Sequence, residues 1–183
     1  MLHAIKRPLL AMAAVLALGA ASPIQADGPV MLTVTGAVEN TNRGPADPEM
    51  DKLFAFNEVS FENAMEFDLG ALEGLPQATV KADFPKGGPM VEFTGPTLSD
   101  VLAAAGAEGE TVTVQAMDGY AVEVAMEELV GNGAVVALAR DGKPFGIGGF
   151  GPAQIVFPRA ERADLAEMPD DWWIWQIYHI KVE

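Results

Sequence analysis

The sequence predicts an α+β fold, a single mixed domain in which short strands predominate. Several short stretches alternate apolar with polar or small residues, and Gly, Pro, Asn and Asp separate them. Only one segment has a clear helical pattern, and the chain has no internal repeat and no linker. Half of the 183 residues are apolar, which is enough for one buried core. We therefore expect one strand-rich domain with few helices.

The first half of the chain predicts strands joined by a loop and a short helix. Residues 31–38 alternate as a strand does, and residues 39–51 are rich in Asn, Pro, Asp and Gly, as loops are. The apolar residues between 61 and 75 predict a strand that enters a short helix. Residues 78–83 and 91–93 are two further strand candidates.

One helix is clearly predicted, and it begins after Pro96. Thr97 and Asp100 have the Thr-x-x-Asp spacing of a helix cap, and Gly106 ends the pattern. The apolar residues that fall on one face are Leu98, Val101, Leu102 and Ala105. We expect this face to be buried.

The second half of the chain predicts a hairpin and three more strands. Residues 111–117 and 120–125 alternate on either side of Asp118 and Gly119, a two-residue spacing that favours a type I′ turn. Residues 126–130 predict one helical turn. The remaining strand candidates are residues 134–139, 154–157 and 174–182.

The N-terminal residues 1–26 have the pattern of a secretory signal peptide. Lys6 and Arg7 precede an apolar run over residues 9–18, and small residues lead up to Asp27. This run is shorter than the ~20 residues that a membrane-spanning helix needs. We therefore predict a secreted protein whose folded domain comprises residues 27–183.

The charge balance disfavours one class of partner. The chain has 11 Lys and Arg against 26 Asp and Glu, a net charge of −15. Removing residues 1–26 leaves 9 basic and 26 acidic residues, a net charge of −17. Nucleic-acid binding depends on neutralising phosphates with basic side chains, so no nucleic-acid partner is expected.

The composition also excludes several kinds of active site. The chain has no Cys, which removes thiol nucleophiles, disulfides, iron–sulfur clusters and cysteine zinc sites. His179 is the single histidine after residue 26, so a histidine-rich metal site is excluded. Neither Ser60 nor Ser99 lies in a G-x-S-x-G elbow, and no D-x-D-x-D-G calcium loop occurs. We predict no metal site.

A glycine-rich stretch formally satisfies the G-x-G-x-x-G dinucleotide motif with Gly146, Gly148 and Gly151. That motif needs a preceding strand and a following helix, whereas Pro152 and a predicted strand follow here. Two interpretations remain open. The stretch is a flexible turn, or its exposed backbone holds an anion or a heterocycle oxygen.

The C-terminal strand candidate gathers all three tryptophans within four positions. Strand alternation places Trp173 and Trp175 on the face that also carries His179 and Lys181, so this face is expected to be only partly buried. Two neighbouring indoles there either stack a flat ring or pack in the core. His179 is expected at the strand surface.

An ordered series of short motifs resembles the sulfite-oxidase-type molybdopterin-binding domain. The likeness spans nearly all of residues 30–182. The motifs are Phe93-Thr94-Gly95-Pro96-Thr97-Leu98, Asp118-Gly119-Tyr120, Asp141-Gly142-Lys143-Pro144, Gly151-Pro152 with Ile155-Val156-Phe157-Pro158, and Trp175-Gln176. The resemblance implies a sulfite-oxidase-like fold built to hold a pterin.

Two departures from the family pattern disfavour molybdenum chemistry. In the enzymes of that family a Cys about a dozen residues before the Gly of the first motif holds the metal, and Asp83 lies there in this chain. An Arg that helps to hold the anionic cofactor is replaced by Gln154. The resemblance therefore favours binding over catalysis, with molybdopterin as a disfavoured cofactor.

The chain looks more like the small periplasmic pterin-binding proteins that reuse this fold without molybdenum. Those proteins pass a pterin signal to the periplasmic domain of a membrane receptor, typically an enzyme that controls cyclic-di-GMP. The resemblance implies a pterin as ligand, with a tetrahydropterin as the candidate. A reduced pterin offers a flat face to an indole and a guanidine-like edge to a carboxylate. The expected ligand-binding residues are Trp173, Trp175, Asp118, Tyr120, Asp171 and Arg140, with Arg140 meeting the pterin carbonyl.

Two alternatives belong to other functional classes. The first is a periplasmic molybdopterin oxidoreductase with an unusual metal ligand at Asp83. The second is a protein-interaction module that uses the fold only as a scaffold. Three observations distinguish these hypotheses from one another: bound pterin, bound molybdenum, and the effect of replacing Trp173 or Trp175.

Overall fold

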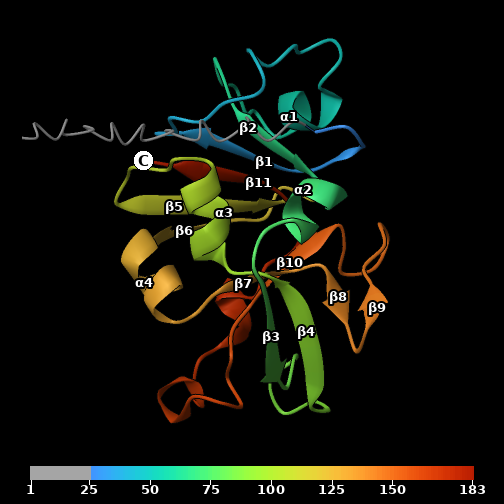
Figure 1. The fold of residues 1–183 in the computed structure, drawn as a ribbon, viewed down its shortest axis with the longest axis vertical. Coiled ribbons are helices and arrows are strands. Elements are labelled where there is room, and N and C mark those ends of the chain that lie inside the picture. Colours follow the sequence, from blue (N-terminus) through green and yellow to red (C-terminus); the bar gives the residue numbers. More distant parts are fainter. Residues whose placement is uncertain (1–25) are drawn as a thin grey trace, which may run out of the picture.

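The computed structural model describes residues 26–183, so the predicted signal peptide lies, apart from Ala26, outside the described residues. Two sheets carry most of this part of the chain, and short helices flank them (Figure 1). Among the described residues, no helix is long and apolar enough to cross a membrane.

The larger sheet has seven strands with the order β2-β1-β11-β10-β7, and β5 joins it through β11 and carries β6. Its strands are β1 (Val30–Gly36), β2 (Met65–Asp68), β5 (Thr111–Ala116), β6 (Ala121–Ala125), β7 (Val135–Ala137), β10 (Ala153–Val156) and β11 (Trp175–Val182). The pairing of β1 with β11 is parallel, and the other pairings are antiparallel. β11 contacts three strands and is the hub of the sheet.

The smaller sheet has four strands in the order β3-β4-β8-β9. They are β3 (Gln77–Ala82), β4 (Val91–Pro96), β8 (Ala139–Arg140) and β9 (Lys143–Pro144). β3 and β4 form a hairpin that extends downward in Figure 1, and the β8–β9 hairpin lies to the right of it. β4 leads from this sheet into the start of α3, beside β7.

The helices are short. They are α1 (Lys52–Phe56), α2 (Leu69–Glu73), α3 (Leu98–Ala104) and α4 (Met126–Gly131), with 3-10 turns η1 (Ala163–Leu165) and η2 (Asp170–Trp172). The predicted cap of α3 is confirmed, because the Thr97 hydroxyl accepts a hydrogen bond from the Asp100 backbone N–H. Leu98, Val101 and Leu102 are buried as expected.

The turn between β5 and β6 differs from the expected type I′ geometry. A type I′ turn needs positive φ at both central residues, whereas here Gly119 has φ +91 and Asp118 does not have positive φ. The Ala116 N–H donates to the Tyr120 carbonyl at 2.8 Å, which closes a three-residue loop. This loop ends on a left-handed glycine, the pattern of a type I turn with a bulge.

The prediction that His179 lies at the surface is wrong. His179 is buried on β11 between β1 and β5. Its Nε2 lies 2.8 Å from the Thr35 hydroxyl, and its Nδ1 lies 3.2 Å from the Gln115 side-chain oxygen. Phe54 of α1 packs edge-on against the imidazole. A helix that the sequence analysis did not predict therefore covers this face.

Strand alternation does not extend to the tryptophans. β11 begins at Trp175, Trp172 ends η2, and Trp173 follows η2 in an irregular conformation. Gln176 has φ +55, which breaks the extended geometry near the start of the strand. As a result Trp173 is buried and Trp175 is exposed, although they are two residues apart.

Candidate functional site

A cavity of about 390 Å³ opens where three segments meet: the β5–β6 turn, the turn after β3, and residues 170–175. Five of the six residues that the sequence analysis selected line it. They are Asp118, Tyr120, Asp171, Trp173 and Trp175. Phe84, Ala116, Asp170 and Ile174 complete the lining. The volume lies in the range of small-molecule sites, which is about 300–1,000 Å³.

Trp173 forms a fixed wall of this cavity. Only 1% of its surface is exposed, and its ring stacks on Phe84 at 5.5 Å with an interplanar angle of 7°. Phe93 and Phe157 pack against it at steeper angles. The core therefore holds the indole in place, and the indole forms one wall of the cavity.

Trp175 is an exposed aromatic residue of the site. It is 43% exposed, and Phe150 meets it edge-on at 6.2 Å between ring centroids. Tyr120, on the β5–β6 turn, is 50% exposed, and its hydroxyl donates to the Asp171 carbonyl at 3.3 Å. This hydrogen bond joins the β5–β6 turn to η2. Aromatic surface is thus available at the cavity mouth.

Two of the three cavity carboxylates have free oxygens. Asp118 Oδ1 accepts the Tyr120 backbone N–H at 3.0 Å, which leaves Oδ2 open. The Asp171 carboxylate has no hydrogen-bond or ion-pair partner among residues 26–183. Asp170 is occupied, because its oxygens accept from Arg159 and from the Lys86 backbone N–H. The open carboxylates are able to accept hydrogen bonds from a ligand.

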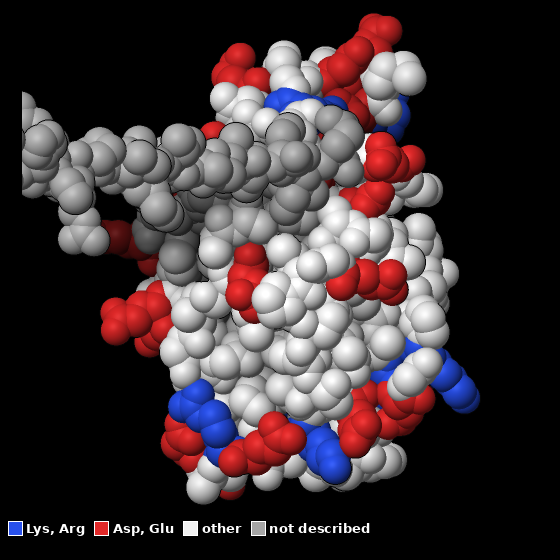
Figure 2. Space-filling view, viewed as in Figure 1, with Lys and Arg blue, Asp and Glu red and all other residues white. Residues whose placement is uncertain are grey.

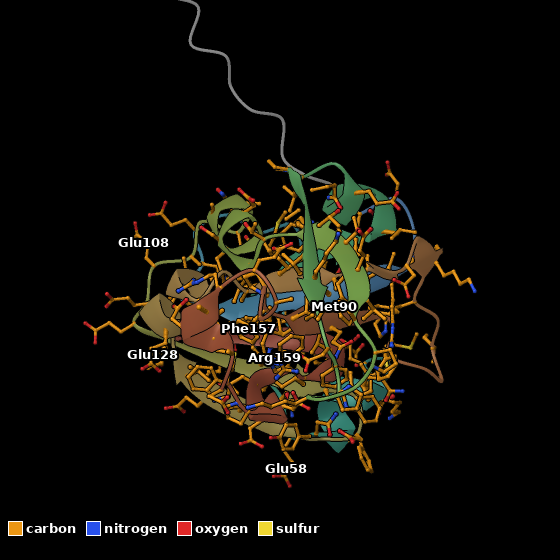
Figure 3. All side chains as sticks on the ribbon, turned by 90° about the horizontal axis from the view of Figure 1, so that it is seen from below. Glu58, Met90, Glu108, Glu128, Phe157 and Arg159 are labelled. Carbon is orange, nitrogen blue, oxygen red and sulfur yellow. The ribbon has the colours of Figure 1, made fainter. Side chains whose placement is uncertain are left out.

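Arg159 supports the cavity from behind, and the sequence analysis did not identify it. It is 4% exposed, and its guanidinium carbon lies 4.4 Å from the centre of the Trp173 ring. It donates to Asp83 Oδ1 and Asp170 Oδ1, both at 2.7 Å, and to the Met168 carbonyl at 2.9 Å. Arg159 and Phe157 lie near the middle of the molecule in Figure 3. One side chain therefore ties together two of the segments that form the cavity.

The electrostatics of Asp83 follow from this contact. Partial burial acts to raise the pKa of the Asp83 carboxyl. A hydrogen bond from the Gly87 backbone N–H and the Arg159 guanidinium act against it, and the net result is a lowered pKa. Asp83 is thus an ionised partner of Arg159.

Arg140 lies outside the cavity. It lines a neighbouring cleft with Lys143, Phe145 and Phe150. Phe150 also contacts Trp175, so one phenyl ring contacts both Arg140 and an aromatic residue of the cavity. The structure thus brings together five of the predicted residues and separates the sixth from them.

A larger hollow of about 690 Å³ lies beside α3 and α4 and contains none of the predicted residues. Its lining is mainly small and apolar, and Ser99, Glu110 and Glu127 are its polar side chains. No aromatic ring faces it, so it offers no stacking surface.

The residues of this chain do not fit a molybdenum–pterin group. The sequence has no Cys, and Asp83, at the position that the resemblance assigns to the metal ligand, is bound to Arg159. Gln154 is fully buried, and neither atom of its amide has a hydrogen-bond partner among the described residues. It carries no charge for an anionic cofactor. No cluster of three or more His, Asp or Glu among residues 26–183 is placed to hold a metal ion.

These observations define a mixed α+β, strand-rich domain of sulfite-oxidase-like fold. The chain is similar to the crystal structure of the sulfane dehydrogenase SoxCD from Paracoccus pantotrophus, with a TM-score of 0.56 and 16% sequence identity. The similarity covers 87% of this chain and 40% of that one, so this chain spans less than half of its neighbour. No family profile and no curated protein sequence matches the chain. At this identity the likeness concerns the fold.

Proposed function

We propose that this chain is a non-enzymatic binding protein that takes a reduced pterin into the cavity between Trp173 and Trp175. The observation that carries the proposal is the gathering of two indoles, a tyrosine and two open carboxylates around one cavity of about 390 Å³. These groups come from segments more than 50 residues apart in the sequence, Asp118 and Tyr120 on one side and Asp171 to Trp175 on the other.

The chemistry of the lining supports a pterin. The exposed face of Trp175 is available to stack a flat heterocycle while Trp173 closes the other side of the cavity. The free oxygens of Asp118 and Asp171 suit the paired N–H groups of a guanidine-like edge, since two parallel hydrogen bonds to a carboxylate are strong and directional. No Lys or Arg lines the cavity, so its walls favour a neutral or weakly cationic ring.

The cellular role is part of the same proposal. The predicted signal peptide supports a periplasmic location, and the resemblance to small pterin-binding proteins supports a membrane signalling protein as the partner. In this role the pterin-bound form would contact the periplasmic domain of a receptor that controls cyclic-di-GMP. A binding protein of this kind needs no metal.

Isothermal titration calorimetry of the purified protein with tetrahydropterin and dihydropterin, under anaerobic conditions, tests the binding. We expect one site per chain, with affinity reduced at least ~10-fold in Trp175→Ala and in Asp171→Asn, because each change removes a ligand contact. Phe56→Ala on α1 and Asp164→Asn beside Arg162 are matched controls that leave binding unchanged. No heat of binding at millimolar ligand would overturn the proposal.

Metal analysis distinguishes the proposed binding protein from the alternative, a molybdopterin oxidoreductase. The protein purified from its own host should contain bound pterin and no stoichiometric molybdenum. Molybdenum at one atom per chain would contradict the proposal and restore the redox interpretation.

A further inference from the structure

The cleft that Arg140 lines has a volume of about 380 Å³, and Phe150, one of its lining residues, also contacts Trp175 of the tryptophan cavity. The β8–β9 hairpin and the loop over residues 145–150 form its walls. Arg140 and Lys143 are its basic residues, and Asp141 is its single acid. We call it the Arg140 cleft.

The sheet register places its basic residues in one row. Phe93 on β4 pairs with Arg140 on β8, which pairs with Lys143 on β9. Residues directly opposite in antiparallel strands project from the same face, so these three side chains are neighbours. The Arg140 guanidinium carbon lies 5.8 Å from the ring centres of both Phe93 and Phe150. Two aromatic rings thus hold the guanidinium in a defined place.

Arg140 differs from the other described arginines. Arg43, Arg159 and Arg162 each form an ion pair with a carboxylate. Within residues 26–183, the side chains of Arg140 and Lys143 have neither an ion-pair nor a hydrogen-bond partner. A half-buried arginine without a counter-ion is unusual in a chain of net charge −15. Its five N–H donors are open to an anion.

The neighbouring acids do not supply the missing counter-ion. Asp141 turns toward β4, where its Oδ1 accepts the Glu92 backbone N–H at 2.9 Å. Glu92 itself faces Lys81 at 3.4 Å. Figure 2 shows basic side chains at the lower right, beside the β8–β9 hairpin, with acidic groups next to them. Two basic side chains and one acid line the cleft, and that acid is bound to the β4 backbone.

The backbone of the cleft leaves room for a ligand. A Cβ atom built on Gly146 or Gly148 would meet no atom within 4 Å, and one built on Gly149 would meet only the Gly146 carbonyl at 3.7 Å. Gln176 anchors the loop, since its side-chain amide donates to the Gly149 carbonyl at 2.9 Å. The loop is thus open toward solvent and tied to β11 beside Trp175.

We propose that Arg140 and Lys143 form an oxyanion subsite that binds a carboxylate or phosphate carried by the same ligand whose ring occupies the tryptophan cavity. This inference rests on the proposed function. Phe150 connects the two sites, because its ring lies 6.2 Å from the Trp175 ring and 5.8 Å from the Arg140 guanidinium carbon. The Arg140 guanidinium carbon is therefore no more than about 12 Å from the centre of the Trp175 ring, a distance that the tail must span. The ligand is therefore a pterin with an anionic tail.

Three probes that share one ring system test this subsite: dihydroneopterin, its terminal phosphate ester, and an analogue that ends in a carboxylate. We expect the phosphate ester to bind about 10- to 100-fold more tightly than dihydroneopterin, as charge-assisted hydrogen bonds to arginine predict. The carboxylate analogue shows whether the subsite prefers phosphate or carboxylate. Higher salt should reduce the tail's advantage and leave dihydroneopterin unaffected.

The variants Arg140→Gln and Lys143→Gln distinguish the contribution of the anionic tail to the affinity from that of the ring. Each should remove most of the advantage of the phosphate ester while the affinity for dihydroneopterin stays the same. Lys52→Gln on α1 makes the same change in charge elsewhere and should behave as the unmodified protein. Equal binding of the three probes, or an equal loss for all three in Arg140→Gln, would overturn the subsite.

A titration with inorganic phosphate distinguishes failure of this inference from failure of the proposed function. Binding is followed by the NMR shifts of the amides of residues 146–149 and of the Arg140 Nε–H. If no pterin binds, the proposed function fails, and the phosphate titration then decides the subsite alone. Saturable shifts that Arg140→Gln abolishes support it, and their absence overturns it.

Discussion

The guanidinium of Arg159 lies 4.4 Å from the centre of the Trp173 ring and bonds at the same time to Asp83 and Asp170. This arrangement buries a positive charge between two carboxylates that belong to segments far apart in sequence. The indole, the guanidinium and the two acids form one unit behind the cavity. The shape of the cavity therefore depends on residues that a ligand does not contact.

Arg159→Ala is expected to lower the free energy of unfolding by about 3–5 kcal/mol, because removing one partner of a buried ion pair leaves uncompensated charge. Urea denaturation measures this change. Arg162→Ala is the matched control: its ion pair with Asp164 is largely exposed, so a much smaller loss is expected. Equal losses in the two variants would show that Arg159 is not a structural centre.

The two cavity tryptophans should respond differently to truncation. Trp173→Ala removes a fully buried ring that packs on Phe84, Phe93 and Phe157, and a loss of about 3–5 kcal/mol is expected. Trp175→Ala, at an exposed position, should cost about 1 kcal/mol or less. Chemical denaturation of both variants measures the two losses of stability. A large loss in Trp175→Ala would contradict its role as an accessible stacking surface.

The burial of His179 predicts that the protein becomes less stable in mildly acidic solution. Burial, with a contribution from Lys181, lowers the pKa of His179 to about 4 from an ordinary value of 6.5. Because the unfolded chain takes up a proton that the folded protein refuses, stability is complete above pH 6.5 and falls as the pH drops toward 4. The loss approaches about 3 kcal/mol.

Urea denaturation between pH 7 and pH 4.5 measures this decline, and His179→Gln should flatten it. An NMR titration of the His179 ring gives the pKa directly. A value near 6.5 would contradict the buried position.

Two glycines give a matched pair of tests for backbone crowding. A Cβ on Gly95 would lie 2.0 Å from the Val136 carbonyl oxygen, where β4 passes β7. Gly95→Ala is therefore expected to cost about 3 kcal/mol or more, since the two strands must separate. A Cβ on Gly131 would meet nothing within 4 Å, so Gly131→Ala at the end of α4 should leave stability unchanged or raise it by about 0.5 kcal/mol.

Local sequence patterns predicted the features of the fold that depend on neighbouring residues, such as helix caps and strands. The Thr97 cap, the buried face of α3 and most strands follow from spacing alone. The cavity residues were found because the resemblance and the tryptophan cluster pointed to the same segments. Their meeting with Asp118 required the structure, since β5 and β11 pair across more than 60 residues.

The failures have specific causes. Alternation could not distinguish Trp173 from Trp175, because η2 precedes the strand and Gln176 adopts positive φ. The burial of His179 depends on Phe54, which comes from a helix with no strong sequence signal. Arg159 follows a buried strand and a proline, a position that gives no indication that two distant carboxylates will meet it.

The parallel pairing of the first strand with the last has a consequence for how the chain folds. Thr33 of β1 lies opposite His179 of β11, and nearly the whole described domain separates these two strands in the sequence. Pairing them closes a very long loop, and contacts between residues so far apart in sequence slow folding.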